Sequence, residues 1–513
     1  MLRIESYRKG VVFSSLFTGM GQLLTLALSM LMASYFGAGE SMDVYYYCLG
    51  AFALAGSFML ALDAGVLIPE AMRLQHQEQP AAAMHFLNYF LYLFAAATGV
   101  LTVLMYLQPA AWLTAVSRFP AAIAQKHLAL VCLLIPAFGL QIIAQYLSDI
   151  LMAHKFFTLP ALYNMLCRLI NILLVWWFHP ALGILSLAWG LILGLVLQIG
   201  LSLFLLRRSL QWDFRAKSAR ANATVWRHVG FTEIAQAATA AALYLPLFMF
   251  SGLAAGAVAA MNYAKRMADL PTTFLTGQFS AVFAIQFNEQ AARKQYGALG
   301  ATLEKNGRLM MGLLVPLSFL LCVTGHDLIT LLFQRGAFDA AAAQSTGRMF
   351  SIFILGLPFL ALSSMTARLL MATRDTGRGT CCQVGSALLM SVILFLAIRY
   401  HGAMGYPFGL LAYYILFFAI VVPVMARWYP YVPFARIVFA GLRQALAALP
   451  PALLAARAAN VLPSAGPLGR LCLAAAIFGC AYILIFFLLP PDRMLQREVR
   501  TLLGYFSHKR KAQ

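Results

Sequence analysis

Charged residues are scarce in this sequence of 513 residues: they make up 11% of it, whereas hydrophobic residues make up 62% and the mean hydropathy is +0.80. No soluble domain of this length has such a composition, so a soluble globular protein is excluded. The apolar runs are also far longer than the alternating segments of about 10 residues that build outer-membrane barrels. The sequence therefore predicts an all-α polytopic membrane protein.

Motifs that would support an enzyme are also missing. The eight cysteines are scattered through apolar segments, and the adjacent Cys381 and Cys382 have no CxxC spacing, which argues against a disulfide framework or a metal site. The sequence has no Walker-type glycine loop, and its short loops offer no paired carboxylates or clusters of His and Cys. We therefore expect a transporter rather than an enzyme, with no cofactor except a coupling cation whose identity the sequence leaves open.

Basic residues outnumber acidic residues by 37 to 17, which gives a net charge of +20. They gather in alternate loops rather than in one domain, which is the positive-inside pattern of membrane proteins and predicts no nucleic-acid partner. The pattern places both termini in the cytoplasm. It also makes 207–227 a basic cytoplasmic linker that contacts anionic membrane lipids, and 491–513 a basic cytoplasmic tail.

About 14 membrane-spanning helices fit into the sequence at roughly 20–25 residues each. We place them at 11–35, 44–68, 84–107, 127–153, 156–178, 182–206, 228–253, 255–287, 309–333, 345–373, 379–400, 404–426, 434–458 and 467–490. The segment before the first span, 1–10, is polar and basic, and no small-x-small site stands out, so we expect no removable signal segment.

Two halves of the sequence repeat at a constant offset in residue number. Four landmarks recur in register: Gly37-Ala38 at Gly256-Ala257, Met42-Asp43 at Met261-Asn262, Glu70 at Glu289, and Met152-Ala153 at Met371-Ala372. The repeat predicts an N-terminal six-helix lobe at 1–206, a C-terminal six-helix lobe at 228–428 and two extra helices at 429–490. Six is an even number, so both copies insert with the same orientation, and we expect a cavity where the lobes meet.

Ionisable side chains inside apolar spans are the strongest lead to function. Each costs roughly 2.5–3.5 kcal/mol at membrane depth and usually faces a bundle interior or a watery cavity. Lys265, Arg266 and Asp269 lie within five positions of one another, and Arg266 and Asp269 share one face of a helix. We interpret them as a site within the span. The alternative is a helix end at the cytoplasmic interface whose basic side chains snorkel.

Arg168 lies about halfway along its predicted span, where a guanidinium suits bidentate capture of a phosphate or carboxylate. A structural ion pair with Asp149 explains it equally well. Asp43 lies at the outer end of the second span and could equally cap that helix with its side chain in water. Further ionisable residues at membrane depth are Asp63, Asp149, Glu233 and Arg368.

Several segments resemble the MurJ (MviN) family of lipid II flippases. Tyr263-Ala264-Lys265-Arg266-Met267-Ala268-Asp269-Leu270-Pro271 resembles that family's Tyr-Ala-x-Arg-x-x-(acidic)-Leu-Pro signature. Three further segments are similar to family elements: Phe36-Gly37-Ala38-Gly39 followed by Asp43, Leu151 to Pro160 at a helix turn, and Leu332 to Asp339 after the ninth helix. The likeness extends along essentially the whole chain.

The resemblance implies two six-helix lobes of the multidrug/oligosaccharidyl-lipid/polysaccharide exporter superfamily, plus two C-terminal helices, in the bacterial inner membrane. It implies a flippase that moves an undecaprenyl-diphosphate-linked glycan, such as lipid II, from the inner to the outer leaflet by alternating access. Arg266 would contact the diphosphate, with Asp269 and Asp43 tuning the cavity. Together with Lys265 and Arg168 they are the candidate substrate-binding residues.

The sequence departs from the family in its first two helices. The family's first helix normally carries two arginines and its second another, whereas the stretches 21–30 and 52–57 contain none. A cavity without these cations should hold an anionic head group less tightly, so the chain resembles a divergent member of the family. The alternatives are a flippase for an exopolysaccharide or O-antigen lipid-linked oligosaccharide, a multidrug or cation antiporter of the same superfamily, and a membrane scaffold without transport activity.

Overall fold

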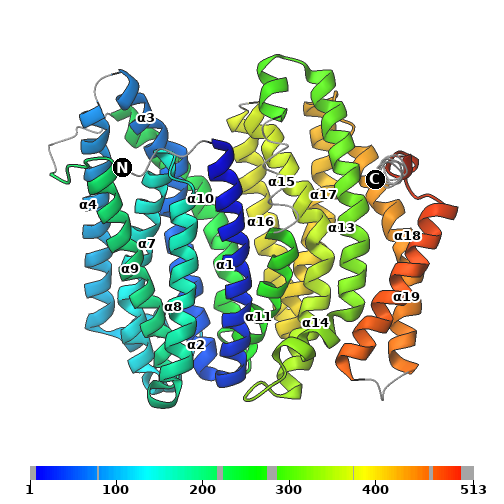
Figure 1. The fold of residues 1–513 in the computed structure, drawn as a ribbon, viewed down its shortest axis with the longest axis horizontal. Coiled ribbons are helices and arrows are strands. Elements are labelled where there is room, and N and C mark those ends of the chain that lie inside the picture. The colour runs from blue at the N-terminus through cyan, green and yellow to red at the C-terminus, as the bar shows by residue number, and fades with distance from the viewer. Residues whose placement is uncertain are drawn as a thin grey trace, which may run out of the picture. The chain divides into compact units, whose positions relative to one another are not determined.

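The computed structural model describes residues 7–77, 80–215, 223–273, 286–373, 375–461 and 466–497. Within these ranges every regular element is a helix (Figure 1). The predicted all-α class is therefore confirmed. The chain separates into two compact units, Met1–Ala259 with Arg335–Phe338, and Ala260–Gln334 with Asp339–Gln513.

The first unit contains ten α-helices, one π-helical turn and the start of an eleventh α-helix among its described residues. Their bounds are α1 Tyr7–Phe36, α2 Glu40–Leu62, η1 Asp63–Leu67, α3 Ile68–Gln77, α4 Pro80–Leu107, α5 Pro109–Val116, α6 Ala121–Lys126, α7 Leu128–Ala153, α8 Thr158–Leu182, α9 Leu185–Ser209, α10 Ala223–Phe250 and α11 Ala257–Pro271. The last of these, α11, continues into the second unit.

Long helices lie side by side in the first unit (Figure 1). Helix α8 packs against α1 and α9, α9 packs against α7, and α7 packs against α4 and α2. The core between them is apolar and aromatic, with Phe90, Tyr146 and Leu147 almost fully buried. Helix α10 packs against α2, so contacts group it with the first unit, although the sequence places residues 228–253 at the start of the second lobe. The predicted lobe boundaries stay a prediction.

The second unit continues with long helices that pack in pairs. They are α13 Tyr296–Phe333, α14 Ala340–Phe353, η3 Ile354–Gly356, α15 Leu357–Ala372, α16 Thr376–His401, η4 Gly402–Met404, α17 Gly405–Trp428, α18 Phe434–Val461 and α19 Pro467–Leu488. Helix α13 contacts α14, α18 and α19, while α16 packs on α17. The two C-terminal helices are thus attached to α13 of the same unit (Figure 1).

Eleven helical stretches of the described residues are long and apolar enough to cross a membrane. They cover twelve of the predicted spans, because the stretch Gly377–Trp428 contains two of them, α16 and α17. The predicted spans 228–253 and 255–287 are represented by the shorter apolar stretch Gln236–Phe250 and by α11. Part of the latter span lies outside the described residues. About 14 spans is therefore consistent with the structure.

The repeat is visible in the backbone. Gly37 and Gly256, which correspond in the two copies, both have positive φ, 64° and 88°. Gly183 and Gly402 are separated by the same offset in residue number, and they end α8 and α16 with nearly identical angles, φ 52° and ψ −134° against φ 57° and ψ −137°. Glycine adopts this region without the steric cost that a Cβ brings. Equivalent turns at one offset support two copies of the same six-helix unit.

Candidate substrate site

Helix α11 presents the predicted ionisable residues on an accessible face. Lys265 and Asp269 are four residues apart and both exposed, and Arg266 is half-buried. On the opposite side Tyr263 and Met267 are buried. The spacing of four brings Lys265 and Asp269 onto one face, where opposite charges attract. Helix α11 is therefore held by an apolar face while its charges remain accessible to a ligand.

Tyrosines of α17 lie close to these charges. The Lys265 ammonium interacts electrostatically with Tyr406 and Asp269, and the Asp269 carboxylate interacts with Arg266 and Tyr414. A tyrosine hydroxyl can donate a hydrogen bond to a phosphate oxygen, as ammonium and guanidinium groups do. Sequence reasoning missed Tyr406 and Tyr414, because aromatic residues are common in apolar spans and their polar tips give no spacing signal.

The first residue of the signature segment has a structural role. The Tyr263 side chain is fully buried, and its ring centroid lies 5.5 Å from that of Phe333 on α13. Such aromatic pairs add roughly 0.5–1.5 kcal/mol beyond the burial of their area. Tyr263 therefore fixes the rotation of α11, which determines where the side chains of Lys265 and Asp269 point.

Asp43 caps a helix other than its own. Its carboxylate accepts hydrogen bonds from the backbone N–H groups of Gly256, at 2.6 Å, and Ala259, at 2.7 Å. These groups belong to the start of α11, where N–H groups lack partners within the helix. The side chain is only 3% exposed, so the interpretation of Asp43 as a cap of α2 with its side chain in water is wrong. Its contribution to substrate binding stays a prediction.

Arg168 lies on α8, half-buried, in the first unit. The Asp149 carboxylate accepts a hydrogen bond from Gln145 at 3.0 Å and interacts with Asp63. Among the ion pairs of the described residues, none joins Asp149 to Arg168. The alternative explanation of Arg168 as half of that pair is therefore not supported, and its role as a phosphate ligand stays a prediction.

An ion pair between a half-buried arginine and a buried aspartate, which the sequence did not suggest, lies in the second unit. Arg470 of α19 and Asp327 of α13 are 2.7 Å apart, and Asp327 is 8% exposed. Both residues are ionisable side chains within apolar helices, and this was the feature of the sequence from which the ion pair could have been suspected. The pair fastens one of the two additional helices to the repeat unit.

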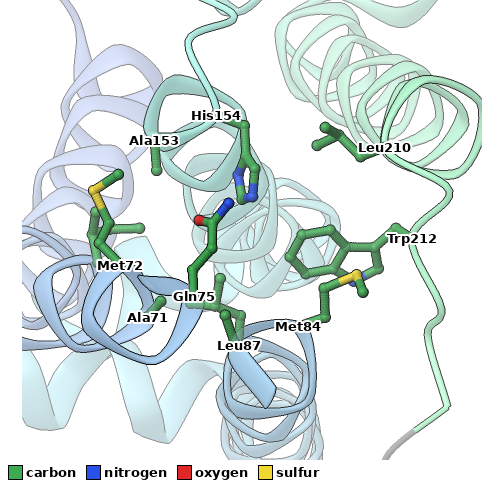
Figure 2. A pocket seen from close by; sticks show the side chains of 11 residues that line it. Ala71, Met72, Gln75, Met84, Leu87, Ala153, His154, Leu210 and Trp212 are labelled. Atoms are coloured by element: carbon green, nitrogen blue, oxygen red, sulfur yellow. The ribbon is translucent and has the colours of Figure 1, made fainter. Parts of the chain in front are cut away.

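The first unit also encloses a small pocket (Figure 2). Its volume is about 150 Å³, and it is lined by residues of α3, α4 and α7 and of the segment after α9. In Figure 2 the side chains of Gln75 and His154 point toward one another inside it, while Trp212 and Met84 close another side. None of the predicted substrate residues lines this pocket, and its size suits water or small ions rather than a lipid-linked glycan.

These features define a class: a polytopic, all-α membrane protein with repeated turns and an accessible charged helix next to buried tyrosines. The chain matches the family model described as "Lipid II flippase MurJ" over residues 32–476. It therefore belongs to the MurJ family, as the resemblance in the sequence indicated.

Two curated relatives illustrate the distance within the family. A lipid II flippase MurJ of Burkholderia cenocepacia is 23% identical over 385 residues, which cover 70% of this chain and 72% of the relative. A probable lipid II flippase MurJ of Rickettsia prowazekii is 25% identical over 123 residues, 24% of each chain. The chain thus spans about a quarter of the length of the Rickettsia relative in that match.

Solved structures share the fold. A lipid II flippase MurJ in an inward closed conformation superposes with a TM-score of 0.76 at 16% identity, covering 93% of this chain and 99% of the other. An inward-facing multidrug resistance MATE family transporter of the MOP superfamily gives a TM-score of 0.62 at 12% identity, covering 81% and 95%. At these identities the likeness shows the fold alone, and this fold agrees with the predicted all-α membrane architecture.

Proposed function

We propose that this protein is a flippase that moves a lipid II-like, polyprenyl-diphosphate-linked glycan from the inner to the outer leaflet of a bacterial inner membrane. Membership of the MurJ family supports a lipid-linked substrate. The observation that carries the proposal is the accessible charged face of α11, where Lys265 lies near Tyr406 of α17 and Arg266 lies near Asp269. Charge-assisted hydrogen bonds from such donors match the oxygens of a diphosphate.

Alternating access would carry the head group outward while the polyprenyl chain remains in the bilayer. An anionic diphosphate moving outward is favoured by an inside-negative membrane potential, and each elementary charge that crosses 100 mV is worth about 2.3 kcal/mol. The potential therefore supplies a driving force without a nucleotide.

The charge of α11 separates this function from multidrug or organic-cation export. Export of a cation favours a carboxylate-rich cavity, because opposite charges attract over the short distances of a binding site. Helix α11 has two cations for one carboxylate. An exopolysaccharide precursor would present the same diphosphate, so only the glycan distinguishes that alternative from lipid II.

Complementation tests the assignment. Expression of the wild-type chain in a bacterium depleted of its lipid II flippase is expected to restore growth. The Arg266→Ala variant is expected to lose rescue while it accumulates in the membrane at the wild-type level. The matched control is Arg399→Ala, which removes an exposed arginine from the last turn of α16 and should keep rescue.

Two results would contradict the proposal in different ways. Rescue by Arg266→Ala would remove this residue from the substrate site. Failure of the wild-type chain to rescue, combined with flipping of another polyprenyl-diphosphate glycan by the purified chain in vesicles, would assign the exopolysaccharide alternative.

A further inference from the structure

Two buried carboxyl groups meet in the first unit. Asp63, at the junction of α2 and η1, is 1% exposed, and Asp149 of α7 is 8% exposed. Neither carboxyl oxygen of Asp63 has a hydrogen-bond partner, and neither does Oδ2 of Asp149. The amide of Gln145 satisfies only Oδ1 of Asp149, at 3.0 Å.

The two carboxyl groups lie within hydrogen-bonding reach of one another. Two ionised carboxylates cannot donate, and like charges this close repel strongly when they are removed from water. Among the described residues no lysine, arginine or histidine forms an ion pair with either carboxyl. The pair therefore lacks the positive charge that would make its burial favourable.

The elements packed around the pair supply few other polar groups. From α7, the hydroxyl of Tyr146 lies near Asp63 but donates to the carbonyl of Leu87 at 2.8 Å. From α10, which contacts η1, Glu233 has a buried Oε1 without a hydrogen-bond partner, although its charge does not act on Asp63 or Asp149. No neighbouring donor thus occupies the unsatisfied oxygens of Asp63.

The backbone at Asp63 departs from the α-helix. The N–H of Ile68 donates to the carbonyl of Asp63, which closes the π-helical turn η1, and such turns occur frequently at functional sites. The pocket of Figure 2 begins one helical turn beyond Asp149, at Ala153. A water-sized cavity therefore lies about one helical turn from the pair.

We propose that Asp63 and Asp149 form a binding site for a small monovalent cation, a proton or Na⁺, held between their carboxyl groups. Either cation supplies the missing positive charge, and each fits a site without room for a larger ligand. Binding itself does not depend on the proposed transport. The further role of the cation in coupling to flipping rests on the proposed function.

The test measures cation binding by the full-length chain, purified in lipid nanodiscs. Thermal unfolding is followed in NaCl and in choline chloride of equal ionic strength at constant pH, and then in choline chloride from mildly acidic to mildly basic pH. We expect the melting temperature to rise with Na⁺ if Na⁺ is the ligand. If the proton is the ligand, we expect it to fall as the pH rises in choline chloride.

Variants separate this site from other carboxylates. Asp63→Asn and Asp149→Asn each remove one charge of the repelling pair, so both should stabilise the cation-free chain and lose the response to the cation. Glu70→Gln, which removes a half-buried carboxylate paired with Arg73 at 2.7 Å in the same unit, should respond as the wild type does.

Two outcomes overturn the proposal. One is a wild-type melting temperature that depends on neither Na⁺ nor pH, and the other is an unchanged response in both asparagine variants. If one variant does not fold, the other suffices, because each removes half of the site. Complementation by the wild-type chain reports the proposed function independently, so failure of the cation site and failure of transport are distinguishable.

Discussion

Asp43 illustrates how one residue can carry two roles that the sequence alone does not separate. The resemblance assigns it to the cavity, and the structure shows its buried carboxylate bonded to two backbone N–H groups at the start of α11. A carboxylate at a helix N-terminus stabilises the helix both through these hydrogen bonds and through the helix dipole. A loss of function on substitution would therefore mix lost binding with a displaced α11.

Asp43→Ala is expected to lower the free energy of unfolding by about 2–3 kcal/mol, because two charge-assisted hydrogen bonds are lost and buried N–H groups remain unsatisfied. Unfolding of the wild type and the variant by titration with a denaturing detergent measures this difference in free energy. The matched control is Asp339→Ala, which removes an acceptor for one N–H at the exposed cap of α14 and should cost about 1 kcal/mol. Equal losses in the two variants would show that the Asp43 contacts contribute no more than an ordinary cap.

Asp492, beyond the last helix, predicts a dependence of stability on pH. Burial alone would raise its pKa, but the hydrogen bonds and charge of Arg308, at 2.5 and 2.7 Å, outweigh burial and hold the pKa below 3.8. A lowered folded-state pKa means that the pair contributes stability above pH about 3.8, and that this contribution is lost as the pH falls further.

Asp492→Asn should therefore be less stable than the wild type near neutral pH, and the difference should shrink below pH about 4. The free energies of unfolding of the wild type and of Asp492→Asn, measured at the same pH values across this range, check this prediction. A difference that stays constant with pH would show that the charge of Asp492 does not matter.

At the scale of elements, the two C-terminal helices α18 and α19 lie outside the six-helix repeat. Helix α18 packs on α13, and α19 contacts both. A core of alanines and Phe478 joins them, and the Arg470–Asp327 pair adds a polar contact. Small residues let helices approach closely in a membrane, where no hydrophobic effect drives them together. The ion pair therefore gives the attachment of α19 its specificity.

Arg470→Leu should destabilise the chain by about 3 kcal/mol, because it leaves the Asp327 carboxylate buried without its partner. The double variant Arg470→Leu with Asp327→Asn should recover part of that loss, since no charge remains. Detergent-induced unfolding of the wild type, Arg470→Leu and the double variant measures both the loss and its recovery. A double variant no more stable than Arg470→Leu would mean that the buried charge is not the cause.

Helices with long apolar runs could be predicted from the sequence more readily than helices with short ones. Long apolar runs predicted twelve spans that the described helices cover, because burial of every backbone polar group in lipid permits only a helix. The helix α11 was harder: its charges shorten the apolar run, and its buried face is held by Tyr263 and Phe333, a pairing between distant segments. The cap that Asp43 supplies to α11 could not be predicted either, and neither could the tyrosines of α17 near its charges. Both depend on tertiary contacts, which residue spacing along the chain does not encode.

At the scale of the molecule, the internal repeat explains why the chain has two compact units with matching turns. It could be predicted because each turn that needs a glycine leaves the same residue in both copies, as at Gly37 and Gly256. The grouping of α10 with the first unit could not be predicted. Its contacts with α2 join two apolar helix surfaces, and the sequence gives both helices only as apolar spans. The lobe boundary predicted from the basic loop reflects membrane topology, whereas the compact units of the structure reflect contacts between helices.

The charge of the loops predicts the orientation of the whole chain. Three spanning helices, α7, α8 and α9, separate Gln125 from Arg215, so these residues lie on opposite sides of the membrane. The basic character of the loop 207–227 predicts that Arg215 lies in the cytoplasm. In a cysteine-free background, Gln125→Cys should react with a membrane-impermeant maleimide in intact cells, and Arg215→Cys only after permeabilisation. The reverse pattern would invert the orientation of every span, and an outward-moving diphosphate would then oppose the membrane potential.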